Sequence, residues 1–201
     1  MIYQKISNFI AKNLVYLILS AYLFYMFFFY YAPDYLFFTK KMEFGYLLGG
    51  DSKRYILGSE KILNSELPSR KSYVGYMIYI AIFKYLKLNL SHVVISQIFL
   101  SFLSSICIYK ISSKLSSRVG GIFCLSLYLF SLPIQVLNFY ILTETLFICS
   151  IIFSLYFLIF FQKKFIPLII FLFIFTISIR PHGIILLLSF FIAFIIWTYL
   201  R

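Results

Sequence analysis

Long runs of apolar residues, separated by short polar segments, dominate the sequence. A helix needs about 20 apolar residues to cross a hydrocarbon core of about 30 Å. Six runs approach that length and predict membrane spans at residues 14–32, 93–111, 119–132, 138–161, 165–179 and 183–200. The pattern predicts an all-α protein, a polytopic transmembrane helical bundle of about six spans. We expect one domain over 1–201: the N-terminus and first span (1–32), an external loop (33–90) and five further spans (91–201).

The predicted first loop, residues 33–90, interrupts the apolar pattern. It holds five of the six acidic residues of the chain, and long loops often carry function. Near its end, the apolar run 73–83 is too short to span a membrane. Lys84 and Lys87 then share one helical face. We therefore expect a juxtamembrane helix at 73–90 that lies in the interface or re-enters the membrane.

Composition narrows the class of protein. Of 201 residues, 63% are hydrophobic and only 12% are charged, which excludes a water-soluble domain and a disordered chain. The net charge of +12 fits cations that flank membrane helices and meet anionic lipid headgroups. We expect no nucleic-acid binding, because no basic segment stands clear of the apolar runs. The three cysteines lie in apolar stretches without metal-ligand spacing and fit a packing role.

The short turns alternate in charge. Three of the polar segments are basic, and the predicted spans place all three on the same side of the membrane. Their cations are Lys5 and Lys12 before the first span, Lys110, Lys114 and Arg118 after the second, and Lys163 and Lys164 after the fourth. The turns near Pro133 and Arg180 are nearly neutral, so the positive-inside rule predicts a cytoplasmic N-terminus. The long loop carries nine cations of its own, which disfavours export. We give the short turns more weight and predict that residues 33–90 lie outside.

Asp51 is the first candidate for chemistry. It follows Gly49-Gly50, which allow a tight turn, and precedes Ser52-Lys53-Arg54-Tyr55. One interpretation is that Asp51 caps the helix that follows. The other is that its carboxylate is held just outside the bilayer, where it accepts a proton from an acceptor hydroxyl.

Glu144 and Arg180 are the other candidates. Glu144 opens an apolar run, and an ionisable group at a membrane helix end is a functional candidate by default. Its alternative role is a first-turn glutamate that the helix dipole favours. Arg180, in Arg180-Pro181-His182-Gly183, offers a planar fork of donors to phosphate, and its alternative is a side chain that snorkels to the interface. His182 alone fits a polar turn residue better than a site residue.

These marks occur in an order that resembles the N-terminal part of GT-C-type glycosyltransferases. These polytopic enzymes, such as the protein O-mannosyltransferases and the lipid A aminoarabinose transferases, use lipid-phosphate sugars. The resemblance covers the first span to about Gly183. Its marks are Gly50-Asp51-Ser52 with Tyr55, Gly75-Tyr76, Ser91 and Gln97, Tyr109-Lys110, Pro133, Thr143-Glu144-Thr145-Leu146-Phe147 and Arg180-Pro181-x-Gly183.

The resemblance implies transfer of a sugar from a polyprenyl-phosphate donor to an unidentified acceptor on the outer face of the membrane. Asp51 would be the catalytic carboxylate, and Arg180, Glu144, Tyr55 and His182 would bind substrate. Asp51 and Glu144 are also candidate ligands of a divalent metal, Mg²⁺ or Mn²⁺, which some branches use. It further implies a multi-pass protein of a bacterial inner (plasma) membrane, with a lipid-linked sugar donor and membrane lipids as partners.

Two further expectations concern the whole molecule. Such enzymes commonly have more spans and a C-terminal portion, so we expect this chain to be incomplete and to show little transferase activity alone. The alternative hypothesis is a non-catalytic multi-span protein, a small transporter or an assembly subunit. That class predicts functional charges inside the bundle at mid-membrane, whereas Asp51, Glu144 and Arg180 map to the outer edge.

Overall fold

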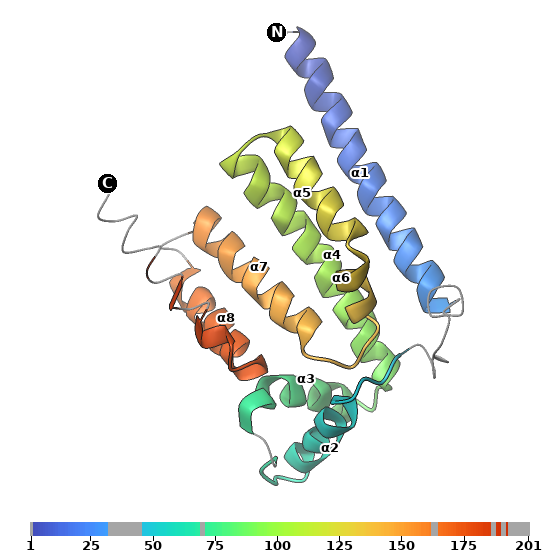
Figure 1. The fold of residues 1–201 in the computed structure, drawn as a ribbon, viewed down its shortest axis with the longest axis vertical. Coiled ribbons are helices and arrows are strands. Elements are labelled where there is room, and N and C mark those ends of the chain that lie inside the picture. Colours follow the sequence, from blue (N-terminus) through green and yellow to red (C-terminus); the bar gives the residue numbers. More distant parts are fainter. Residues whose placement is uncertain are drawn as a thin grey trace.

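A computed structural model shows an all-helical protein (Figure 1). It describes residues 2–31, 46–68, 71–161, 165–185, 188–189 and 192. The helices are α1 (Ile2–Tyr31), α2 (Ser52–Leu63), the 3₁₀ helix η2 (Lys71–Tyr73), α3 (Val74–Tyr85), α4 (Leu90–Leu115), α5 (Arg118–Phe130), α6 (Leu132–Leu137), α7 (Glu144–Phe161) and α8 (Ile166–Ile179). An isolated parallel β-bridge joins Leu47 to Tyr140. The all-α prediction is confirmed.

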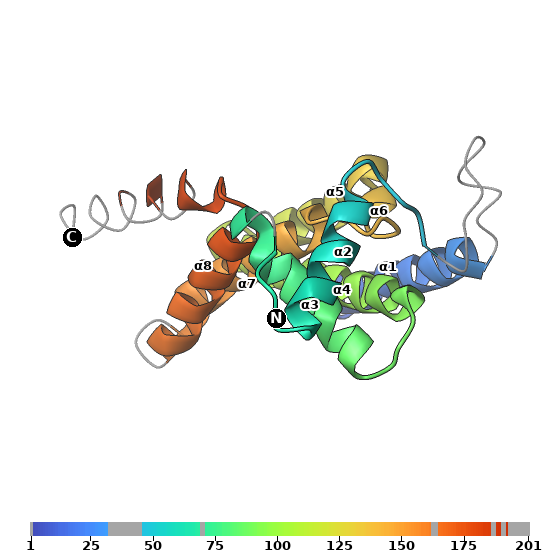
Figure 2. The same ribbon diagram turned by 90° about the horizontal axis from the view of Figure 1, so that it is seen from below.

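The long helices alternate in direction along the chain (Figure 1). α1, α5 and α8 run toward α2 and α3, while α4 and α7 run away from them. This arrangement gathers α2, α3, residues 138–143, the start of α7 and the end of α8 at one end of the bundle, here called the loop end. Figure 2 looks onto this end.

Two helices, α4 and α7, are long and apolar enough to cross a membrane. The predicted spans 119–132 and 165–179 correspond to α5 and α8, which have 13 and 14 residues. At 1.5 Å per residue each reaches only about 20 Å, less than the usual hydrocarbon thickness. The predicted first span, 14–32, overlaps α1, whose apolar part is Asn13–Phe28, and its last residue lies outside the described residues. Most of the predicted span 183–200 and residues 33–45 of the first loop lie outside the described residues.

The predicted span 138–161 is wrong at its start, because α7 begins only at Glu144. Before it, the chain runs beside Leu47: the Leu47 N–H donates to the Phe139 carbonyl at 2.8 Å, and the Ile141 N–H donates to the Leu47 carbonyl at 3.1 Å. The Phe139 carbonyl and the Ile141 N–H therefore form hydrogen bonds with the first loop. These bonds replace the ones that a helix would provide.

α3 confirms that the segment after the polar loop holds a helix too short to span, since its 12 residues reach about 18 Å. It lies across the bundle at the loop end and contacts α4 and α8 (Figures 1 and 2). Its inner face buries Tyr76, Met77 and Ile80, whereas Ile78 and Ile82 are exposed on the other side. That apolar outer face suits a helix lying in a membrane interface.

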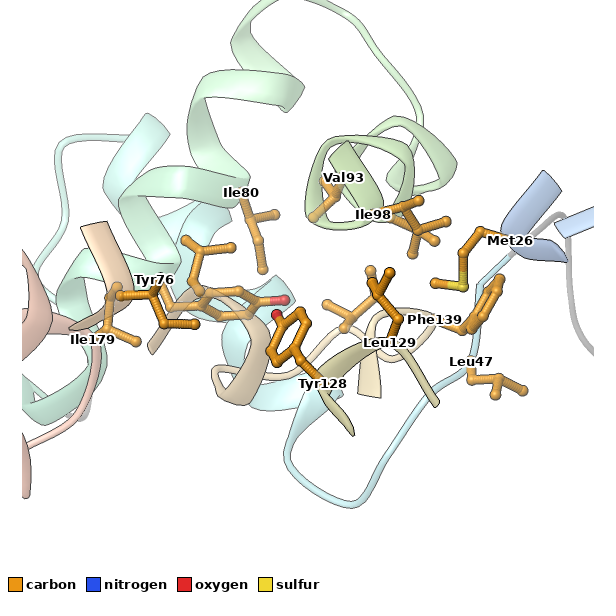
Figure 3. Packing of buried hydrophobic residues seen from close by; sticks show 14 of the residues in the cluster. Met26, Leu47, Tyr76, Ile80, Val93, Ile98, Tyr128, Leu129, Phe139 and Ile179 are labelled. Atoms are coloured by element: carbon orange, nitrogen blue, oxygen red, sulfur yellow. The ribbon is translucent and has the colours of Figure 1, made fainter. Parts of the chain in front are cut away.

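The core joins the loop end to the long helices. Figure 3 shows buried side chains from five helices and two connecting segments: Met26, Leu47, Tyr76, Ile80, Val93, Ile98, Tyr128, Leu129, Phe139 and Ile179. Uncharged polar groups bond beside them; the Tyr22 hydroxyl donates to Gln135 Oε1 at 2.8 Å. Among residues whose burial is described, no Asp, Glu, Lys or Arg is buried. The mid-bundle charges expected of a transporter are therefore not found in the described core.

α3 rests on α8 through Gly75, and this contact yields a stability prediction. A Cβ added at Gly75 would overlap the Ser178 hydroxyl and lie 3.0 Å from the Ser178 carbonyl carbon. We expect Gly75→Ala to lower the free energy of unfolding in detergent by about 1–3 kcal/mol, the usual cost of overpacking. The control is Gly50→Ala, because a Cβ at Gly50 meets nothing within 4 Å. Equal stability of the two variants would contradict the close α3–α8 packing.

Candidate functional site

The turn before α2 is fastened to the segment before α7 by Ser52. The buried Ser52 hydroxyl donates to the Ile141 carbonyl at 2.8 Å and accepts from the Gly49 N–H at 2.8 Å. Gly49 also lies against Leu142, whose side chain would be 3.2 Å from an added Cβ. The first loop is therefore fixed against residues 138–143, which lead directly into Glu144.

Asp51 occupies the N-cap position of α2, but its side chain makes no capping hydrogen bond. Its carboxylate instead pairs with the Arg54 guanidinium at 2.6 Å, and the Asp51 side chain is 50% exposed. The capping interpretation therefore fails for the side chain. The carboxylate is accessible to a substrate at the surface of the loop end.

Tyr55 lies one helical turn after Asp51 and is buried. Its ring centre is 5.6 Å from that of Tyr73 and 5.3 Å from that of Tyr76. Burial and then the charge of Asp51 raise the pKa of the Tyr55 hydroxyl; a hydrogen bond with Thr143 opposes this rise, and Glu144 adds to it. The Tyr55 hydroxyl is thus a protonated donor near both predicted site carboxylates.

Glu144 and Arg180 form an ion pair, although 36 positions separate them in the sequence. Arg180 Nε donates to the Thr143 hydroxyl at 2.9 Å, and that hydroxyl donates to Glu144 Oε2 at 3.3 Å. We call Thr143, Glu144 and Arg180 the arginine cluster. The side chains of Arg180 and Glu144 remain 32% and 25% exposed, and the guanidinium lies 5.8 Å from the Phe147 ring centre. The cluster is fixed in position and still open to solvent.

The backbone explains how Arg180 reaches this cluster. Arg180 ends α8 in an extended conformation, and the Gly183 N–H donates to the Arg180 carbonyl at 2.9 Å to close a turn. A Cβ on Gly183 would lie 3.1 Å from the Ile177 backbone, so glycine permits the chain to fold back tightly. His182 is exposed in this turn, and its carbonyl accepts from the Ile185 N–H at 3.1 Å.

Three residues that support the site were not predicted as site residues: Ser52, Thr143 and Gln97. Gln97 is buried, and its Nε2 donates to the carbonyls of Asn138 and Tyr140 at 3.0 and 2.9 Å. Its Oε1 accepts from the Tyr76 hydroxyl at 2.9 Å. The available signal was a glutamine inside a predicted span, where an amide needs partners.

A divalent metal does not fit this site. Each predicted ligand is already paired with a guanidinium, Asp51 with Arg54 and Glu144 with Arg180. Across the described part of the chain, no three His, Cys, Asp or Glu side chains are grouped so that they could hold a metal ion. We therefore derive no chemical step through a metal.

The structure thus brings four of the predicted residues, Asp51, Tyr55, Glu144 and Arg180, to the loop end from three helices and their flanking turns. No protein-family model matches the chain, and no curated protein or solved structure gives a match. Function is therefore inferred from the residues and contacts described above.

Proposed function

We propose that this chain is a multi-span membrane protein and a glycosyltransferase module of the GT-C type. In this proposal α4 and α7 cross the membrane, α1, α5 and α8 pack beside them within it, and α2 and α3 lie at its outer surface. The module binds a polyprenyl-phosphate sugar at the loop end and transfers the sugar to an acceptor hydroxyl.

Residues at the opposite end of the bundle support the membrane part of this proposal. Lys110 lies 5.7 Å from the ring centre of Tyr156, and Lys114 lies 4.6 Å from that of Phe160. Lys114 Nζ also donates to the Ile159 carbonyl at 2.9 Å. Cations among aromatic side chains are typical of the cytoplasmic interface of membrane proteins. The loop end would then face outward.

One observation carries the transferase part: the half-exposed carboxylate of Asp51, the buried phenol of Tyr55 and the partly exposed guanidinium of Arg180 all lie at the loop end. Arg180 bonds through Nε and Nη2 within the arginine cluster, and its partly exposed fork still suits the oxygens of a phosphate. In this proposal, Asp51 accepts the proton of an acceptor hydroxyl.

The acceptor oxygen forms a bond to the anomeric carbon of the sugar while its proton passes to Asp51. The bond between that carbon and the phosphate oxygen breaks, and the bonding electrons stay on the lipid phosphate. Arg180 stabilises this developing negative charge. Tyr55 donates a hydrogen bond near the two carboxylates and orients the bound groups.

The test is binding of a radiolabelled polyprenyl phosphate to the full chain in nanodiscs of zwitterionic lipid. We expect Arg180→Ala to weaken binding about tenfold or more, since a hydrogen bond to a charged group contributes about 1.5–3 kcal/mol. Arg118→Ala, at the opposite end, is the matched control and should leave binding unchanged. Polyprenol, which has no phosphate, should bind both variants alike. If the two variants weakened phosphate binding equally, Arg180 would only anchor the chain at the interface.

A further inference from the structure

The arginine that the proposed function assigns to the donor phosphate is not free in the structure. Glu144 pairs with one end of the guanidinium, and Thr143 accepts from its Nε. A phosphate that binds bidentately to the same fork must therefore compete with the Glu144 carboxylate. Two anions bound to one guanidinium also repel each other. Replacement of the carboxylate by the phosphate is therefore more favourable than binding of both at once.

We infer that Glu144 is a displaceable counter-ion: the donor phosphate takes its place on Arg180 and releases its carboxylate into the site. This inference rests on the proposed function and changes the role of Glu144 from substrate or metal ligand to competitor. Before the donor binds, the Glu144 carboxylate holds the Arg180 guanidinium in the orientation that the phosphate will use.

The surroundings of Glu144 lower the free-energy cost of releasing its carboxylate from Arg180. It is the first residue of α7, where the positive end of the helix dipole stabilises an anion. Thr143 donates to the second carboxylate oxygen, Oε2, and this bond does not require Arg180. Both partners of the ion pair are partly exposed, at 32% and 25%, so water can reach the carboxylate when it leaves the guanidinium.

Displacement of Glu144 by the phosphate predicts that removing the Glu144 charge strengthens donor binding. Glu144→Gln removes the competing charge, so we expect polyprenyl phosphate to bind about fivefold more tightly, which corresponds to about 1 kcal/mol. Glu60→Gln is the matched control: Glu60 pairs with Lys84 at 2.6 Å on the same end of the bundle and should not change binding. Weaker binding by Glu144→Gln would overturn the inference.

A second readout follows the exchange without any substitution. Carbodiimide coupling of a glycine ester to carboxylates, read by mass spectrometry, should modify Glu144 more when polyprenyl phosphate is added. Glu60 should not change, and polyprenol should have no effect. Inorganic phosphate distinguishes the source of the group: equal release by free phosphate would show that the lipid chain is not needed. Unchanged or reduced labelling of Glu144 with polyprenyl phosphate would contradict the exchange.

The results for Arg180→Ala and Glu144→Gln distinguish failure of the counter-ion role from failure of the proposed function. If Arg180→Ala leaves phosphate binding intact, the proposed function fails. If Arg180→Ala weakens binding and Glu144→Gln weakens it as well, the proposed function stands and Glu144 is instead a group that helps to bind the donor.

Discussion

Under the proposed function, we expect Asp51→Asn to lower sugar-transfer turnover by about 10²-fold or more, the usual scale for loss of a general base. The substitution keeps the shape of the side chain and removes its charge and basicity. Because Asp51 makes no capping hydrogen bond, the change spares α2. It loses only the exposed pair with Arg54, worth about 1 kcal/mol or less. Stability and donor binding should therefore survive.

The measurement compares transfer rates from a polyprenyl-phosphate sugar at saturating donor, alongside polyprenyl-phosphate affinity for each variant. Glu66→Gln is the control, because Glu66 is another exposed acid of the same loop. A selective loss of turnover in Asp51→Asn assigns the proton transfer to Asp51. Near-normal turnover would remove Asp51 from the chemistry and leave Glu144 as the next candidate.

Gln97→Leu is expected to have the largest effect on stability. It removes the three hydrogen bonds that the Gln97 amide makes, with the carbonyls of Asn138 and Tyr140 and the hydroxyl of Tyr76. Each buried group left unsatisfied costs about 1–3 kcal/mol, so we expect the free energy of unfolding to fall by about 3 kcal/mol or more. The segment before α7 should also shift, which would weaken phosphate binding at Arg180.

Unfolding of the chain in mixed micelles with increasing denaturing detergent measures this loss. Thr145→Val is the matched control, because the buried Thr145 hydroxyl has no hydrogen-bond partner in the structure. Removing that hydroxyl should be neutral or stabilising. Comparable losses in both variants would show that the Gln97 bonds do not hold the 138–143 segment.

Sequence patterns predicted the helices well where apolar runs end at polar residues or proline. The runs at 93–111 and 165–179 match α4 and α8, with α4 longer at both ends. The start of α7 was missed, because residues 138–143 are as apolar as a helix but bond to Leu47 and Gln97. Such long-range partners are invisible to a periodicity that describes only neighbouring residues.

The same holds for the candidate site: single residues could be selected from the sequence, but the contact between them could not be predicted. Glu144 and Arg180 could be selected because charges are rare beside apolar runs, and Asp51 because it follows the turn-forming Gly49-Gly50. The ion pair between Glu144 and Arg180 could not, since it depends on where α7 begins and where α8 ends. That pairing decides the chemistry, because a carboxylate held by a guanidinium is a poor metal ligand and a good counter-ion.

The most direct test of the central claim is photo-crosslinking of a polyprenyl phosphate that carries a photoreactive group next to its phosphate, in nanodiscs containing the full chain. We predict crosslinks to peptides that contain residues 51–55 and 143–147, both at the loop end, and their loss when unlabelled polyprenyl phosphate competes. Crosslinks concentrated at residues 110–118, at the opposite end, or a pattern unchanged with a polyprenol probe, would contradict a phosphate site built from Asp51, Tyr55, Glu144 and Arg180.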